Sequence, residues 1–201
     1  MKNKLAQIEQ QPPSSRFFVF DPERLHAVAR RAVGLPFHQM VQQVIDDLAR
    51  EYPKHIETKQ EWIFSCAGGA VGVMTVLHAS LSEYVAIFGS AVGTEGFSGR
   101  YRIGIHDFVL AGEMWTYTGD NIGERVITRP GERAYLRTDQ VKGFKLPEGG
   151  WMLEYGQGPI PTALPFALGD ALFSAMDLET LWKTLWIYGR LVVKELVKGK
   201  I

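Results

Sequence analysis

The 201-residue chain lacks several features that would point directly to a chemistry. Its single cysteine, Cys66, excludes an intramolecular disulfide. Its 22 Lys and Arg residues balance its 22 Asp and Glu residues, so the zero net charge gives no general electrostatic reason to expect a nucleic-acid partner. Neither a signal-peptide core nor a run of about 20 apolar residues occurs near the N-terminus, and we therefore expect no membrane-spanning helix there.

Histidine is also scarce, with five residues in the whole chain. Three of them lie in or just after predicted helices without ligand-like spacing and are interpreted as surface residues: His26, His38 and His55. In the strand-rich region only His78 and His106 remain, and alternation places His106 on the opposite strand face from Asp107. We therefore expect neither a metal site nor a cofactor.

Composition and the pattern of apolar residues divide the chain into an N-terminal arm and one domain. Residues 1–17 are polar and contain Pro-Pro-Ser-Ser, which predicts a flexible N-terminal arm. The remainder, 18–201, is predicted to be a single domain with a helical part at 18–60, a strand-rich part at 61–158 and C-terminal helices at 159–201.

Two helices are predicted in the 18–60 part. Asp21-Pro22-Glu23 is typical of a helix start, with an N-cap acid and a proline at the first helical position, and Gly34 ends that helix. Apolar residues at the helical period predict a second helix from Phe37 to Tyr52. Both are interpreted as packing elements.

From Trp62 to Tyr155, short apolar runs are broken by glycine and turn residues, as in a β-sandwich or barrel. Gly93-Thr94-Glu95-Gly96 is interpreted as a turn, or a lid near a cavity. The fold class is therefore mainly β with flanking helices (α+β).

Two carboxylates stand alone on apolar strand faces. In the stretch Trp151 to Ala167, alternation puts Glu154 on the same face as Met152, away from any obvious cation. In the stretch Tyr101 to Gly112, Asp107 is the only charge on its face. A buried carboxylate must be neutralised, paired or hydrogen-bonded, so a rim or backbone-bonded glutamate is the structural alternative for Glu154. If the two acids lie close together, one keeps a proton near neutral pH, as a proton-transfer pair requires.

The C-terminal segment is unusually apolar. Residues Ile160 to Met176 contain one charge, Asp170, and Asp177 caps a last helix whose charges fall near one stripe. Trp182 and Trp186 with nearby Lys and Arg are typical of an interfacial helix, so we expect contact with membrane lipid. A pair of core-packing helices or an oligomer contact is the alternative.

These stretches resemble one protein family. The matching segments are WIFSCAGG at 62–69, HASLSEY at 78–84, FGSAVGTEGFSGR at 88–100, and the stretches 151–161 and 164–180. Together they resemble the sterol C8–C7 (Δ8–Δ7) isomerases and their relative, the sigma non-opioid intracellular receptor type 1. The resemblance runs from about Phe18 to near the C-terminus, although family members usually begin with a membrane-spanning helix.

The resemblance implies a cupin-like β-barrel and two C-terminal helices that form a flat, membrane-facing layer. It also implies a homotrimer and peripheral association with a membrane, which would be that of the endoplasmic reticulum in a eukaryote. It makes Tyr84 a pocket-lining residue whose hydroxyl can reach Glu154 or Asp107. Beside it, Glu83 is either an acid that holds a cavity wall through hydrogen bonds or, as we favour, a structural buried acid. Alternation and the family match together predict this cavity lining: Trp62, Met74, Val76, Tyr84, Phe88, Ile105, Leu164, Ala167 and Tyr188.

Such a lining suits a rigid, sterol-sized apolar ligand. The resemblance implies that Asp107 and Glu154 shift a ring double bond from C8 to C7, one acid adding a proton and the other removing one. Which acid does which stays open, because a close pair titrates as a unit. The competing hypothesis is a receptor that binds sterols or cationic amphiphilic amines without catalysis. A metal-dependent cupin enzyme and a ligand-free membrane scaffold are two further alternatives.

Overall fold

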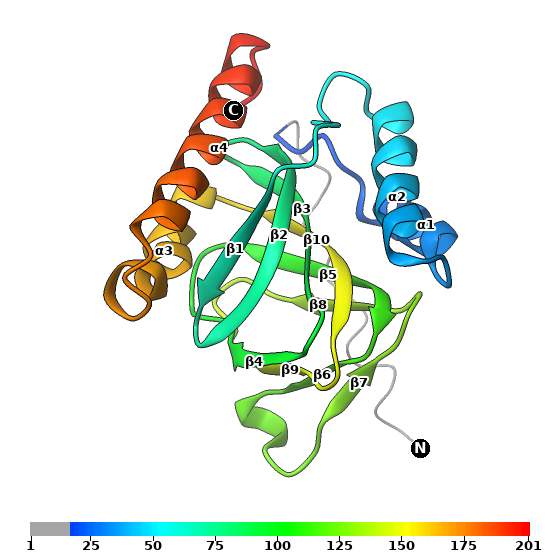
Figure 1. Ribbon diagram of the computed structural model, residues 1–201, viewed down its shortest axis with the longest axis vertical. Helices are drawn as coiled ribbons and strands as arrows, with labels where there is room; N and C mark the ends of the chain where they lie inside the picture. Colours follow the sequence, from blue (N-terminus) through cyan, green and yellow to red (C-terminus); the bar gives the residue numbers. More distant parts are fainter. Residues whose placement is uncertain (1–16) are drawn as a thin grey trace.

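The computed structural model describes residues 17–201 (Figure 1), so the predicted arm, apart from Phe17, lies outside the described residues. Ten strands form its centre: β1 (Trp62–Ala67), β2 (Ala70–Ala79), β3 (Glu83–Ser90), β4 (Thr94–Phe97), β5 (Gly104–Gly112), β6 (Met114–Tyr117), β7 (Val126–Thr128), β8 (Arg133–Leu136), β9 (Gly143–Leu146) and β10 (Gly150–Gln157). The helical elements are α1 (Pro22–Ala32), α2 (Phe37–Glu51), α3 (Leu164–Phe173) and α4 (Leu178–Val197), with short 3₁₀ turns at Gly119–Asn121 and Ile160–Ala163.

The strands form two antiparallel sheets. The larger has the order β1-β2-β3-β10-β5-β8 and the smaller the order β4-β9-β6-β7. This confirms the mainly β fold with flanking helices. The expected cupin-like barrel is an open one, a β-sandwich, because in the described part of the chain the edge strands β1 and β8 belong to no ladder that joins the sheets.

Helices α1 and α2 cover the outer face of the larger sheet. The Asp21 carboxylate caps α1 by accepting hydrogen bonds from the backbone N–H groups of Glu23 (2.8 Å) and Arg24 (3.4 Å), as the sequence predicts. The apolar face of α2 packs with strand residues such as Leu153 and Tyr155 in the largest hydrophobic cluster. Both predicted N-terminal helices are therefore confirmed as packing elements.

Strand alternation then decides what β10 presents to each side. Leu153 and Tyr155 join the cluster under α1 and α2, whereas Met152 and Glu154 line a cavity on the opposite face. The outer face of the sheet is thus fixed by helices, and its inner face is left for a site.

Of the expected turn at Gly93–Gly96, all but Gly93 belongs to strand β4, which pairs with β9. A side chain at Gly96 would place its Cβ 2.7 Å from the backbone nitrogen of Ala70, so this glycine permits close approach of two backbones rather than a turn. Both β4 and β9 are only four residues long, and apolar periodicity is a weak signal over that length.

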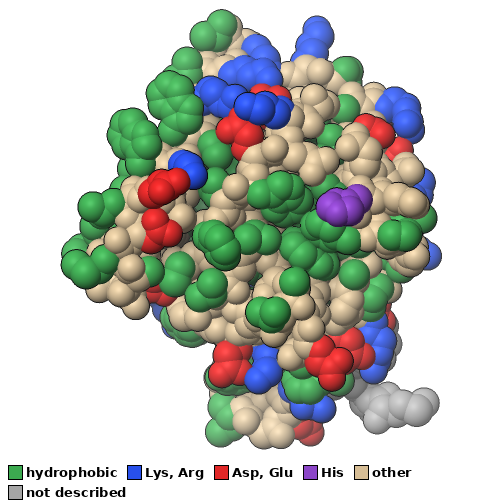
Figure 2. Space-filling view, in the orientation of Figure 1, with side chains coloured by type: hydrophobic (Ala, Val, Ile, Leu, Met, Phe, Trp, Pro, Cys, Tyr) green, Lys and Arg blue, Asp and Glu red, His purple; other side chains and the backbone are tan. Residues whose placement is uncertain are grey.

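Helices α3 and α4 lie beside β1 and β2 (Figure 1). Asp177 caps α4 by accepting a hydrogen bond from the Thr180 N–H at 2.9 Å, and Asp170 of α3 accepts one from the Gly69 N–H at 2.8 Å. Apolar side chains gather over these helices at the left of Figure 2; the exposed ones include Phe173, Met176, Leu178, Trp182 and Trp186. Within residues 17–201, none of the helices combines the length and the apolar character that crossing a bilayer requires.

Candidate active site

A cavity of about 220 Å³ lies between the inner faces of the two sheets and is also bordered by helices α3 and α4. Eight of the nine predicted lining residues border it: Met74, Val76, Tyr84, Phe88, Ile105, Leu164, Ala167 and Tyr188. Phe97, Tyr101, Met114, Phe144 and Phe166 extend the same apolar wall. Asp107, Glu154 and Lys142 are the charged residues among the described ones that line it.

Trp62 is the exception, because it packs on the opposite face of β1. Its ring contacts Phe37 of α2 and Trp151 of β10, at centroid distances of 6.0 and 5.8 Å. Ser65 and Ala67 of the same strand line the cavity, so the period of two sends Trp62 outward. The predicted placement of Trp62 in the cavity was therefore wrong.

The two lone acids meet across neighbouring strands. Glu154 of β10 and Asp107 of β5 are direct partners in the antiparallel register, and both line the cavity. Side chains directly opposite on one face have Cβ atoms about 4.5–5.5 Å apart, close enough for two carboxyls to interact strongly.

Tyr84 of β3 donates a hydrogen bond from its hydroxyl to Oε1 of Glu154. The register places Gly156, not Glu154, directly opposite Tyr84. A Cβ at Gly156 would lie 2.1 Å from the Tyr84 ring. This glycine therefore gives the ring room to lean along the strand toward the carboxyl two residues away.

Lys142, immediately before β9, forms an ion pair through its Nζ with Oδ2 of Asp107. Both side chains are largely buried, with 11% and 5% of their surface exposed. Sequence reasoning missed this residue, since Lys142 lies in a short connection where no periodicity indicates a direction. The pair is consequently asymmetric: Asp107 has a cation and Glu154 has a phenol.

Burial and the neighbouring Asp107 raise the pKa of Glu154 from 4.5 to about 7, against the opposing effects of the Tyr84 hydrogen bond and Lys142. Glu154 is partly buried and lines the cavity. Burial also raises the pKa values of Tyr84 and Tyr101, and the Glu154 charge adds to both shifts. Both phenols therefore stay protonated near neutral pH, and that of Tyr84 donates its hydrogen bond to Glu154.

Glu83 serves the fold on the other side of β3. It is fully buried and accepts hydrogen bonds from the backbone N–H of Val19 (2.7 Å) and the Tyr155 hydroxyl (2.7 Å). Lys200 Nζ lies 3.2 Å from it. Its contacts are thus with the N-terminal segment, Tyr155 of β10 and the C-terminus, and Glu83 does not line the cavity.

The family model described as "ERG2 and Sigma1 receptor like protein" matches residues 4–200. The chain belongs to this family. It is 39% identical over 189 residues to the C-8 sterol isomerase ERG2 of Gibberella zeae, covering 92% of this chain and 80% of that protein. It is 36% identical over 183 residues to the sigma non-opioid intracellular receptor 1 of Xenopus tropicalis, covering 90% and 82%.

Among solved structures, an RmlC-like cupin from Shewanella frigidimarina is similar to this chain with a TM-score of 0.42 and 18% identity. The match covers 50% of this chain and 85% of the cupin chain. The family resemblance inferred from the sequence is confirmed by the family match and the two named relatives. Membership in a family that contains both isomerases and a receptor leaves the choice between catalysis and binding to the site itself.

Proposed function

We propose that the protein is a sterol isomerase that shifts a ring double bond from C8 to C7, with Glu154 and Asp107 as the proton-transfer pair. The observation that carries the proposal is the direct opposition of these two carboxyls inside an apolar cavity. The relatives named C-8 sterol isomerase support the substrate class.

The asymmetry of the pair supports a role for each acid. Glu154, with its raised pKa, holds a proton near neutral pH and donates it to C9 of the Δ8 sterol. The electrons of the C8–C9 double bond form the new C9–H bond, which leaves a tertiary cation at C8.

Asp107, paired with Lys142, then accepts a proton from C7, and the electrons of that C–H bond form the C7–C8 double bond. Glu154 is left ionised and Asp107 protonated. One proton passing from Asp107 to Glu154 restores the starting state, and their opposition in the register supports this return. No redox change and no external proton are required.

The cation at C8 lies between groups that favour it. The carboxylate stabilises the positive charge electrostatically, and aromatic faces of the lining, such as those of Tyr101 and Phe88, add cation–π attraction. A hydrophobic ammonium compound would occupy the same place as this intermediate, so cationic amphiphilic amines are expected to be competitive ligands.

Delivery of the sterol from a bilayer is part of the proposal. Trp182 and Trp186 expose 67% and 62% of their surface on α4, and the cavity is bordered by Leu164 and Ala167 of the neighbouring α3. Indoles and exposed apolar residues on one helical layer favour peripheral contact with membrane lipid. The sterol would then enter the cavity past these helices.

The test is turnover of a Δ8 sterol by the purified full chain in detergent or lipid, compared with Glu154→Gln and Asp107→Asn. We expect the wild type to form the Δ7 product and each variant to lose about 10²-fold or more in kcat, the range of general acid–base contributions. Glu148→Gln, at an exposed glutamate outside the cavity, is the matched control and should retain activity.

A well-folded wild type without turnover would refute the isomerase. If that protein also bound a hydrophobic amine tightly, and Glu154→Gln abolished the binding, the receptor function would be established instead. Absence of both turnover and amine binding would refute the site assignment.

A further inference from the structure

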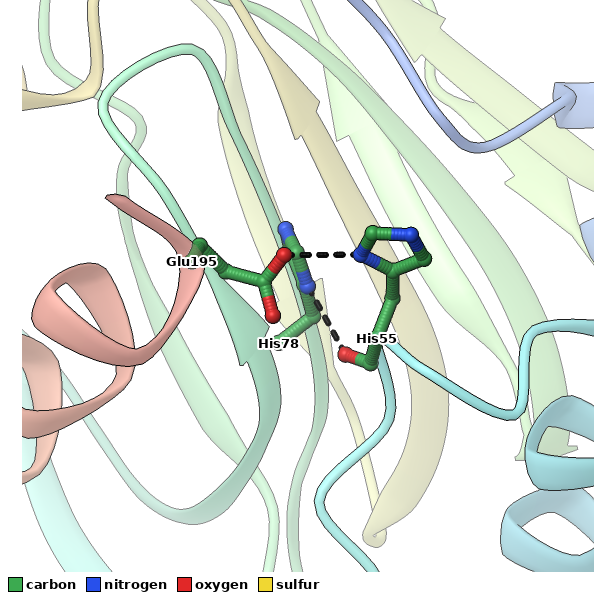
Figure 3. Close-up of side chains that lie close together, drawn as sticks. All are labelled: His55, His78 and Glu195. Atoms are coloured by element: carbon green, nitrogen blue, oxygen red, sulfur yellow. Dashed lines mark hydrogen bonds and ion pairs between the residues drawn. The ribbon is translucent and has the colours of Figure 1, made fainter. Parts of the chain in front are cut away.

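Three side chains from distant parts of the chain meet outside the cavity (Figure 3). His55 follows α2, His78 lies near the end of β2, and Glu195 lies in the last turns of α4. One potential ligand atom of each lies within 4.8 Å of the others. Nδ1 of His55 is 2.7 Å from Oε2 of Glu195.

His78 brings an unused lone pair to this cluster. Its Nδ1 lies 2.8 Å from the backbone carbonyl oxygen of His55. A carbonyl oxygen only accepts, so Nδ1 carries the ring proton and Nε2 carries the lone pair. Nε2 is buried and has no hydrogen-bond partner in the described structure, although buried ring nitrogens are normally satisfied.

This arrangement has the outer-sphere hydrogen bond typical of a metal-ligating histidine. Such histidines donate their other ring N–H to a carbonyl or carboxylate, which fixes both the tautomer and the ring orientation. His78 makes that bond to the His55 carbonyl, and it is 1% exposed. The buried Nε2 of His78 is therefore available to coordinate a metal ion.

We infer that His55, His78 and Glu195 form a binding site for a zinc-like divalent transition-metal ion. Two imidazoles and one carboxylate are a ligand set that Zn²⁺ accepts, with a water in the fourth tetrahedral position. The ion takes the place of the His55 Nδ1 proton and contacts His55 Nδ1, Glu195 Oε2 and the His78 ring. The displaced proton moves through solvent to Nε2 of the same ring, so the His55 imidazole stays neutral.

The charges around the cluster are compatible with this exchange. Lys198 Nζ contacts Oε1 of Glu195 at 2.6 Å, so Oε2 is the oxygen left for the metal. The His55 side chain is 23% exposed, which gives an ion a path from solvent.

The site would join α4 to β2 and to the segment after α2. None of the three ligands lines the cavity that holds Asp107 and Glu154, so the metal site does not share residues with the proposed active site. Metal binding and sterol turnover are therefore separable, and failure of one does not decide the other.

The experiment uses the full chain in detergent, stripped with a chelator and titrated with Zn²⁺ against a competing chromophoric chelator. Co²⁺ is added in parallel, because four-coordinate Co²⁺ gives intense visible absorption bands. Metal content after dialysis is measured by elemental analysis. The variants are His55→Ala, His78→Gln and Glu195→Gln, with His38→Ala, at an exposed histidine, as the matched control.

We expect one Zn²⁺ per chain with a micromolar or lower Kd, and an affinity at least tenfold weaker in each ligand variant but unchanged in His38→Ala. Each variant is compared only after its circular dichroism matches the wild type. Wild-type protein that binds no Zn²⁺ and gives no four-coordinate Co²⁺ spectrum would overturn the site, whatever the variants do. Zinc binding that all three ligand variants retain would also overturn it.

Discussion

Replacing Glu154 by glutamine removes the ionisation of this side chain but keeps its size and shape. The amide of the Glu154→Gln variant keeps an oxygen that accepts the Tyr84 hydrogen bond but cannot ionise opposite Asp107. In the wild type, burial and Asp107 oppose ionisation of Glu154 and raise its pKa from 4.5 to about 7. The folded state therefore keeps a proton that the unfolded chain has already lost.

The magnitude follows from linkage. A shift from 4.5 to about 7 corresponds to about 3 kcal/mol, at roughly 1.4 kcal/mol per unit. Because the folded pKa is raised, this stability is fully present below pH 4.5 and is lost as pH rises through about 7. We thus expect the unfolding free energy of Glu154→Gln, relative to wild type, to rise by about 3 kcal/mol between pH 4.5 and pH 8.

Denaturant or thermal unfolding in one detergent, at half-unit pH steps, measures this difference. Glu148→Gln controls for the loss of an exposed carboxylate. A difference between Glu154→Gln and wild type that stays constant across the pH range would refute the reasoning. A difference that changes in the opposite direction would mean that Glu154 is ionised in the folded protein and Asp107 is the acid.

Two further substitutions test the surroundings of the pair. Lys142→Met removes the cation from Asp107 and should lower kcat about tenfold or more. It should also move the descending limb of the pH–rate profile to higher pH, because Lys142 lowers the pKa of Glu154. Lys145→Met, which removes an exposed ion pair, should leave that profile unchanged, and a matching change in both would sink the idea. Glu83→Gln should lower the unfolding free energy by about 3 kcal/mol, because it removes the carboxylate that faces the buried Lys200 ammonium. Glu179→Gln, in an exposed pair, should cost under about 0.5 kcal/mol by the same denaturation assay, and equal losses would contradict a special role for Glu83.

The sequence predicted the direction of a side chain well in strands that have one clearly apolar face. The alternation of β10 placed Glu154 on the cavity side, and that of β5 did the same for Asp107. Alternation gives the face of a residue but not its register, so the direct opposition of the two acids required the structure. The one misplaced lining residue, Trp62, lies on an edge strand with apolar residues on both of its faces, so alternation could not tell which face borders the cavity.

Lys142 and the His55–His78–Glu195 cluster were missed for a different reason. Each depends on chain connections rather than on a repeating pattern. Lys142 stands in the link between β8 and β9, and the cluster combines a loop, a strand and a helix that are separated by up to 140 residues. Spacing along the chain carries no signal for contacts of this kind.

Two tyrosine–glutamate hydrogen bonds on neighbouring strands show why residue type alone could not assign the site. Tyr84 of β3 donates to Glu154 of β10 on the cavity face, and Tyr155 of β10 donates to Glu83 of β3 on the helix face. Glu83 is fully buried and Glu154 partly buried, and both accept from a phenol. They differ in what lies on their remaining side: Glu83 meets backbone N–H groups and Lys200, whereas Glu154 meets Asp107.

The donors around Glu83 tie its carboxylate to three parts of the chain, the N-terminal segment, β10 and the C-terminus. A carboxyl that faces another acid is destabilised as an anion, and its pKa moves into the range where proton transfer occurs at neutral pH. The chemistry therefore depends on which glutamate the strand register places opposite Asp107. A one-residue slip of β10 against β5 would turn Glu154 toward the helices and bring Tyr155 to the cavity.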